Sequence, residues 1–214
     1  MKLAPFKFRV VPWCVAAALM IASAANAASL SIFNTGVDPF ANALLGNGTP
    51  DPHYSLIVQP GAATAVTVDP TNYPFPPWIA NTTGSRWIGP AADSQGPAGN
   101  YVYRTTFTVP PSAILGSVAI NGDWATDDPG TDIKINGIST GQNSNFFTTL
   151  QPFSVTSGFV IGLNTLDFYL TNAGGPTGLR VDKIVGTYQV PEPLSATLFA
   201  AGLSIAVTCT RRRR

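Results

Sequence analysis

The feature that most constrains this chain is the alternation of apolar and polar residues in several short runs. In Tyr101–Val109 the tyrosines, Phe107 and Val109 fall on one face, and Arg104, Thr106 and Thr108 fall on the other. The same two-residue period recurs in three further segments: 132–135, 166–171 and 179–182. This period is typical of half-buried strands in antiparallel sheets. No helical period is sustained between residues 28 and 190.

Further apolar segments bounded by turn residues extend the pattern to about nine strands. The additional strand candidates are 54–59, 63–68, 117–121, 150–156 and 184–189. Asn136-Gly137 predicts a tight hairpin, because both central residues of such a turn need a positive φ. Turns are also expected at Asn121-Gly122 and at 172–175, and a long loop over one end of the fold is expected at 70–84. The fold class that follows is an all-β antiparallel sandwich or jelly roll.

The N-terminal segment has the three parts of a secretory signal peptide. Basic residues come first, an apolar run from Val10 to Ala25 follows, and Ala25-Asn26-Ala27 supplies the small residues of a cleavage site. We therefore predict that residues 1–27 are a signal peptide, cut after Ala27 by signal peptidase. The alternative is an N-terminal membrane helix that is retained.

The C-terminal segment contains a second apolar run, residues 194–210, which has no charged residue. As a helix it would be about 25 Å long, at the short end of the transmembrane range. Arg211, Arg212, Arg213 and Arg214 follow it, and the positive-inside rule predicts that they stay in the cytoplasm. A nucleic-acid-binding tail is the alternative, but the arginines directly follow a membrane segment.

The residues just before this run, Pro191-Glu192-Pro193, can neither continue a strand nor lie inside a helix. Together with the apolar run and the terminal arginines, they make residues 190–214 resemble the PEP-CTERM sorting signal of Gram-negative bacteria. This resemblance implies processing near the motif by an exosortase and an association with exopolysaccharide and biofilm matrix. It also implies an inner-membrane-anchored precursor with a cytoplasmic arginine tail, followed by delivery to the cell surface or extracellular matrix.

Charge is distributed unevenly between the ends and the body. Residues 28–190 contain five basic and ten acidic residues, a formal charge of −5, although the whole chain has a charge of +1. The body therefore cannot neutralise many phosphates, which excludes a nucleic-acid binder. It also contains no cysteine, so a sandwich domain at 28–189 has to be held together by its apolar core.

The second half of the body resembles galactose-binding-like β-sandwiches. The resemblance rests on three segments: 101–107, 127–137 and 159–168. It implies a fold, and it fixes no ligand or binding residue, because that fold binds its ligands in variable loops.

The body has no residue pattern that is typical of an enzyme. His53 is its only histidine, and there is no Gly-x-Ser-x-Gly elbow and no glycine-rich phosphate loop after a strand. The densest acidic group consists of Asp123, Asp127, Asp128 and Asp132. Adjacent carboxylates on an extended strand point to opposite faces, so this group is interpreted as a solvated turn or a calcium site. No other cofactor is expected.

Three tryptophans are candidates for stacking on a sugar ring. Trp87 lies in a short apolar strand and is expected in the core, whereas Trp78 and Trp124 follow loop and turn residues and could be exposed. Two functions follow from these features. The first is an exported, non-enzymatic surface or matrix protein sorted by an exosortase. The alternative is a lectin-like carbohydrate-binding module, in either a calcium-dependent or a calcium-independent form.

Overall fold

The computed structural model describes residues 25–191, apart from residues 62, 72 and 146. These residues form one compact unit in which every regular element is a β-strand. The strands are β1 (Ala25–Leu30), β2 (Ser55–Val58), β3 (Val66–Thr67), β4 (Ile88–Gly89), β5 (Gln95–Gly96), β6 (Gly99–Val109), β7 (Ile114–Asp127), β8 (Gly130–Ile135), β9 (Ile138–Ser139), β10 (Gln151–Val155), β11 (Gly162–Asn172), β12 (Gly175–Pro176) and β13 (Gly178–Pro191). Within the described part of the chain, no helix is long and apolar enough to cross a membrane.

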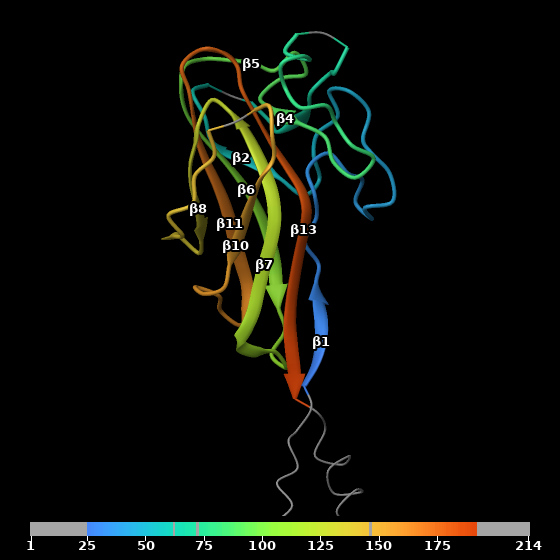
Figure 1. Cartoon of the computed structure of the whole chain (residues 1–214), viewed down its shortest axis with the longest axis vertical. Coiled ribbons are helices and arrows are strands. Elements are labelled where there is room, and N and C mark those ends of the chain that lie inside the picture. The colour runs from blue at the N-terminus through green and yellow to red at the C-terminus, as the bar shows by residue number, and fades with distance from the viewer. Residues whose placement is uncertain (1–24, 62, 72, 146, 192–214) are drawn as a thin grey trace, which may run out of the picture. The chain divides into compact units, whose positions relative to one another are not determined.

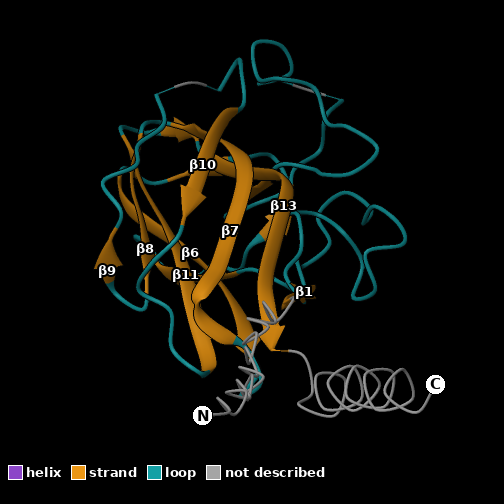
Figure 2. Ribbon diagram, turned by 60° about the horizontal axis from the view of Figure 1, so that its bottom comes forward, coloured by secondary structure: helices purple, strands orange, loops and turns teal. Residues whose placement is uncertain are grey.

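Two antiparallel sheets face each other (Figures 1 and 2). The first has the order β10-β7-β13-β4-β3, with β1 paired to the far part of β13, and the second has the order β2-β6-β11-β8-β9. A short ribbon of β5 and β12 lies apart from both. The predicted antiparallel β-sandwich is therefore confirmed.

The alternation in the sequence corresponds to the two faces of the second sheet. Strand β6 pairs with β11 along its whole length, from Gly99 opposite Asn172 to Val109 opposite Gly162. One face of these strands is buried in the core by Tyr103, Phe107 and Val109 of β6 and by Leu166, Phe168 and Leu170 of β11, while Arg104 and Asp167 lie on the other face. There Arg104 makes a bidentate ion pair with Asp167, with nitrogen–oxygen distances of 2.6 and 2.7 Å.

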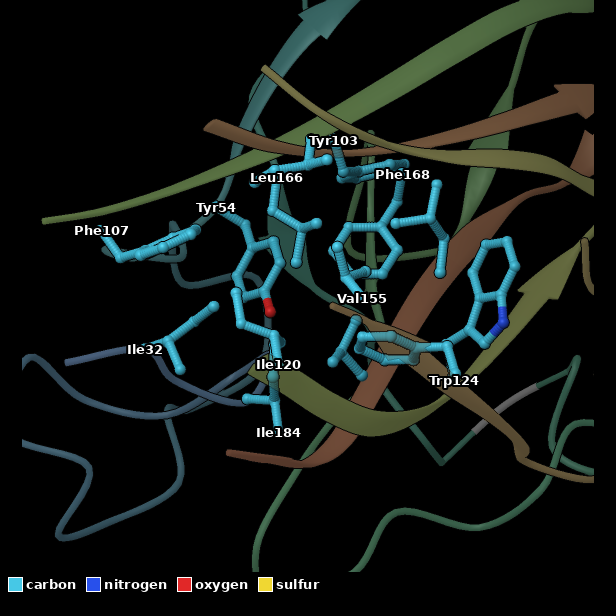
Figure 3. Packing of buried hydrophobic residues seen from close by; sticks show 14 of the residues in the cluster. Ile32, Tyr54, Tyr103, Phe107, Ile120, Trp124, Val155, Leu166, Phe168 and Ile184 are labelled. Atoms are coloured by element: carbon cyan, nitrogen blue, oxygen red, sulfur yellow. The ribbon is translucent and has the colours of Figure 1, made fainter. Parts of the chain in front are cut away.

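The sandwich core lies between the two sheets and is rich in aromatic residues (Figure 3). Phe168 is at its centre, with ring centroids 5.7 Å from those of both Trp124 and Phe153, and 6.2 Å from that of Tyr54. A body of about 160 residues can bury enough apolar surface to fold without disulfides. Since this unit has its own core, we expect it to fold without the terminal segments.

A second apolar cluster, here called the outer cluster, lies on the opposite face of the first sheet. Its buried members are Val68, Trp78, Trp87 and Ala125, with Phe75, Ile79, Phe147 and Leu150 packed against them. Ala125 belongs to β7, and the others come from loops. The proline-rich segment 70–84, expected to be a loop over one end of the fold, is a loop that packs on this face near the Asp127 end of β7.

Two of the predicted local features need correction. Asn121-Gly122 is not a turn, because both residues lie inside β7, which is much longer than the predicted strand 117–121. The separate strands predicted at 179–182 and 184–189 form the single strand β13. The hairpin at Asn136-Gly137 is confirmed, with φ values of 50° and 81°.

The two ends of the described chain lie side by side. Ala25 pairs with Pro191, and Ala27 pairs with Gln189. The predicted cleavage after Ala27 therefore falls inside β1, and this cleavage stays a prediction. Glu192, Pro193, the apolar run 194–210 and the arginines 211–214 lie outside the described residues, as does most of the predicted signal peptide.

Candidate functional site

An open groove of about 570 Å³ crosses the first sheet where β10, β7 and β13 run side by side (Figure 2). Val118, Ile120 and Trp124 of β7 point into the sandwich core. Because side chains alternate along a strand, Asn121 and Asp123 point to the opposite face. The groove is lined by Asn121, Gly122, Asp123, Gln142, Pro152, Phe153, Ser154 and Lys183.

A β-bulge brings a positive charge to this groove. The pairing of β13 with β7 shifts between Asp182 and Val185, and Lys183 has a φ of 50° there. Its ammonium group donates to Asp123 at 3.2 Å, and its side chain is 74% exposed. A pair this exposed contributes little to stability, so both groups can exchange partners with a ligand at small cost.

Gln142 forms one wall of the groove. Its amide nitrogen donates to the carbonyl of Ser154 at 2.9 Å, and its amide oxygen accepts from the Ser154 amide at 2.8 Å. These two bonds satisfy backbone groups of Ser154 on β10, as a neighbouring strand would. They also hold the Gln142 side chain in one place beside the groove.

A second depression, of about 240 Å³, lies along the same strand. It is lined by Ile135, Ile138, Ser139, Thr140 and residues 154–157. Ser154 lines both depressions. Two depressions therefore lie beside each other near β10 and share one lining residue.

The four acidic residues that suggested a calcium site are not gathered around one point. Asp123 accepts from Lys183, Asp128 accepts from the Ala173 amide at 2.7 Å, and Asp132 accepts from the Gly141 amide at 3.2 Å. No group of three potential metal ligands occurs among the described residues. Of the two alternatives from the sequence, the calcium site would require these side chains to leave their present partners.

Asp127 has a different environment from the other three. Its Oδ2 accepts from the indole nitrogen of Trp78 at 2.6 Å. Burial raises the pKa of Asp127 to about 6; the bond from Trp78 opposes this rise, and the neighbouring Asp128 adds to it. The Asp128 carboxyl accepts from the Ala173 amide, so the two adjacent carboxyl groups have different hydrogen-bond partners.

The predicted stacking role of Trp78 and Trp124 is wrong. Trp124 is fully buried in the sandwich core, and Trp78 is 3% exposed in the outer cluster. Trp78 packs on Trp87 with ring centroids 4.1 Å apart. Their faces are covered by protein, so neither can lie against a sugar. Trp87 is buried, as predicted.

Of the residues that line the groove, only Asp123 was singled out from the sequence. Asn121 was assigned to a turn, and Gln142, Ser154 and Lys183 belong to no motif. The alternation along 117–123 could have identified Asn121 and Asp123 as exposed neighbours on one strand. Nothing in the local sequence places Gln142 or the bulge at Lys183 beside them.

No family model and no curated protein matches this chain. Among solved structures, it is similar to a family 35 carbohydrate-binding module from Clostridium thermocellum, with 20% identity, 51% of this chain and 82% of that one covered, and a TM-score of 0.33. It is also similar to a cyclase from Fischerella sp. TAU, with 11% identity, 78% and 100% covered, and a TM-score of 0.45. A third is the CBM35 from Paenibacillus barcinonensis, with 15% identity, 62% and 92% covered, and a TM-score of 0.36. Similarities this distant transfer no binding role.

Proposed function

We propose that this domain is an exported, non-enzymatic module that binds a polysaccharide along β10. The observation that carries the proposal is the open groove across β10, β7 and β13, where several hydrogen-bonding side chains lie around a largely apolar floor. Its chemistry suits sugar hydroxyl groups, which both donate and accept hydrogen bonds. Asn121 offers both functions in one amide, Asp123 only accepts, and Lys183 only donates.

The shape of the site favours a polymer over a small apolar ligand. Sites for small molecules are usually enclosed, whereas this groove is open and shares Ser154 with the second depression. A chain of several sugar units can lie along such a surface. Since the three candidate tryptophans are buried, hydrogen bonds carry the recognition, and we expect modest affinity.

The location proposed for the module comes from the sequence. A signal peptide at 1–27 would export the body, and the PEP-CTERM-like segment 190–214 would pass it to an exosortase. The resemblance then implies delivery to the cell surface or matrix, where exopolysaccharide is the abundant glycan. The body would act there as a matrix protein that holds polysaccharide.

The test uses the domain from Ala25 to Pro191 in affinity electrophoresis and on a glycan array, with and without calcium. We expect retention by at least one acidic or neutral bacterial polysaccharide. The double variant Asn121→Ala, Asp123→Ala should lose most of this retention. Asn100→Ala, which alters an exposed asparagine of β6 in the other sheet, should retain it.

Two results would count against the proposal. Absence of binding to any glycan in both conditions would remove the function. Equal retention of the wild-type domain and the double variant would move the site away from the groove. Export is tested separately: unchanged processing and location after substitution of Pro191 and Glu192 would exclude the sorting role of the motif.

A further inference from the structure

Among the residues that the structure describes, one end of the sandwich, here called the charge-free end, has no acidic or basic side chain. It is formed by the β6–β7 connection at 110–113, the β10–β11 connection at 156–161, the first residues of β1 and the last residues of β13 (Figure 1). The segments that meet there have no Asp, Glu, Lys, Arg or His: 25–30, 107–117, 156–166 and 184–191. All charged residues of the body, which give it a net charge of −5, therefore lie outside these segments.

The same end exposes large aliphatic side chains. Their exposed fractions are 40% for Ile114, 41% for Leu115, 47% for Val160, 44% for Ile161 and 67% for Leu163. The strand pairing brings them to one end, because Gly162 lies opposite Val109 and Ile114 lies opposite Gln189. Grouped exposed aliphatic residues on a soluble domain mark an interaction surface.

The loop that carries Val160 and Ile161 is held in place. Phe159 anchors it in the sandwich core, with its ring centroid 6.2 Å from that of Phe107. The buried side chain of Asn164 accepts from the Val160 amide at 2.9 Å and donates to the carbonyls of Val160 and Gly162 at 2.8 Å. The outward direction of the two aliphatic side chains is thus fixed by hydrogen bonds.

The short covalent connection between Pro191 and the predicted transmembrane run limits how far this end can lie from a membrane. Pro191 ends β13 at the charge-free end, and the predicted transmembrane run starts three residues later, at Leu194. Three residues span at most about 11 Å. A bilayer that holds 194–210 therefore lies within that reach of Pro191.

We propose that the charge-free end rests on the membrane surface in the anchored precursor, with Ile161 and Leu163 in contact with the lipid interface. The charge distribution fits this orientation. Moving a charged group from water into an apolar environment costs free energy, and the charged residues of the body lie outside the segments that form this end. Aliphatic side chains are stabilised where headgroups meet acyl chains. The proposal does not depend on glycan binding.

The test uses the full chain with Cys14→Ala and Cys209→Ala, reconstituted into phosphatidylcholine vesicles. A single Ile161→Cys or Leu163→Cys then carries an environment-sensitive fluorophore, and lipids with a spin label near the headgroup act as quenchers. The matched control is Ile57→Cys on β2, an isoleucine of nearly equal exposure, 42% against 44%. Ile57 lies far from the charge-free end. Its neighbour Val58 pairs with Val102, and Val102 is seven residues, or about 23 Å, along β6 from Val109.

We expect labels at 161 and 163 to be quenched several-fold more than the label at 57, with blue-shifted emission. Equal quenching at the three positions would overturn the proposal, as would a chain that fails to float with the vesicles. Quenching between labels at 161 that grows with the protein-to-lipid ratio, without quenching by lipid, would show that a second copy covers this end, and it would also overturn the proposal. Loss of glycan binding in Asn121→Ala, Asp123→Ala should leave the lipid quenching unchanged.

Discussion

The sandwich core and the outer cluster bury similar residues in different ways. In the sandwich core the buried side chains are supplied largely by alternate positions of long strands, such as β6, β7 and β11. In the outer cluster, among the buried members only Ala125 belongs to a strand, and both tryptophans lie in loops. Trp87 donates to the carbonyl of Ile79, 8 residues away in sequence, and Trp78 donates to the carboxylate of Asp127, 49 residues away. Periodic burial is visible in a sequence, whereas burial by a loop that folds back onto a sheet is not.

The comparison also explains where the groove lies. The outer face of β7 and β13 is covered near Ala125 and open near Asn121 and Asp123. In the covered part, Arg180 of β13 holds the loop against the sheet. Its fully buried guanidinium donates to Ser85 at 2.8 Å, to the Ala80 carbonyl and to Asp182 at 3.2 Å. The loop that buries the tryptophans thus leaves the rest of that face to solvent.

The largest effect is expected in the sandwich core. Phe168→Ala removes a fully buried ring that contacts three other aromatic residues. We expect it to lower the free energy of unfolding by about 3–5 kcal/mol, measured by urea denaturation of the domain. A loss below 1 kcal/mol would mean that the core is loosely packed around this position.

A smaller effect is expected in the outer cluster. Trp78→Phe keeps a ring but removes the donor to the half-buried Asp127, so we expect a loss of about 1–3 kcal/mol. Because the change is local, limited proteolysis in 70–84 should accelerate more than global unfolding does. Trp87→Phe, which loses a bond to the Ile79 carbonyl instead, is the matched control for the Asp127 contact.

The pH dependence of stability sharpens this comparison. The pKa of Asp127 is about 6 in the folded domain and about 3.9 in an unfolded chain. The folded state therefore binds the proton more tightly, and the contribution of Asp127 to stability is lost as pH rises from 4 to 6. Relative to Asp127→Asn, the wild-type domain should lose on the order of 1–2 kcal/mol over this window, after allowance for solvent screening of a partly exposed group.

Unfolding curves measured at several pH values for both proteins check this. A difference between them that does not vary with pH would contradict the raised pKa of Asp127. Trp87→Phe should show the same pH slope as the wild-type domain.

The smallest effect concerns calcium. Since the acidic residues have separate partners, we expect equal unfolding midpoints in millimolar calcium and in EDTA. A calcium-dependent shift of several degrees that disappears in Asp128→Asn would contradict this and support a calcium site.

Much of the sandwich could be predicted from sequence, because each long strand has apolar residues on one face. The alternation of 101–109 is that of β6, and Asn136-Gly137 is the hairpin between β8 and β9. The groove could not be predicted, because it depends on contacts between distant segments: Gln142 reaches Ser154, and the bulge at Lys183 forms only when β13 pairs with β7. Trp78 and Trp124 were misjudged because their neighbours in sequence are polar or proline-rich.

The pairing of β1 with β13 has a consequence for maturation. Val190 and Pro191 pair only with Asn26 and Ala25 among the described residues. If signal peptidase cuts after Ala27, the released peptide takes both partners with it. The strand just before Glu192 then becomes a free edge, which a second protease can bind in extended form. Cleavage of the signal peptide would thus be required before the C-terminal segment can be cleaved. A chain in which cleavage after Ala27 is blocked should therefore accumulate with both terminal segments intact.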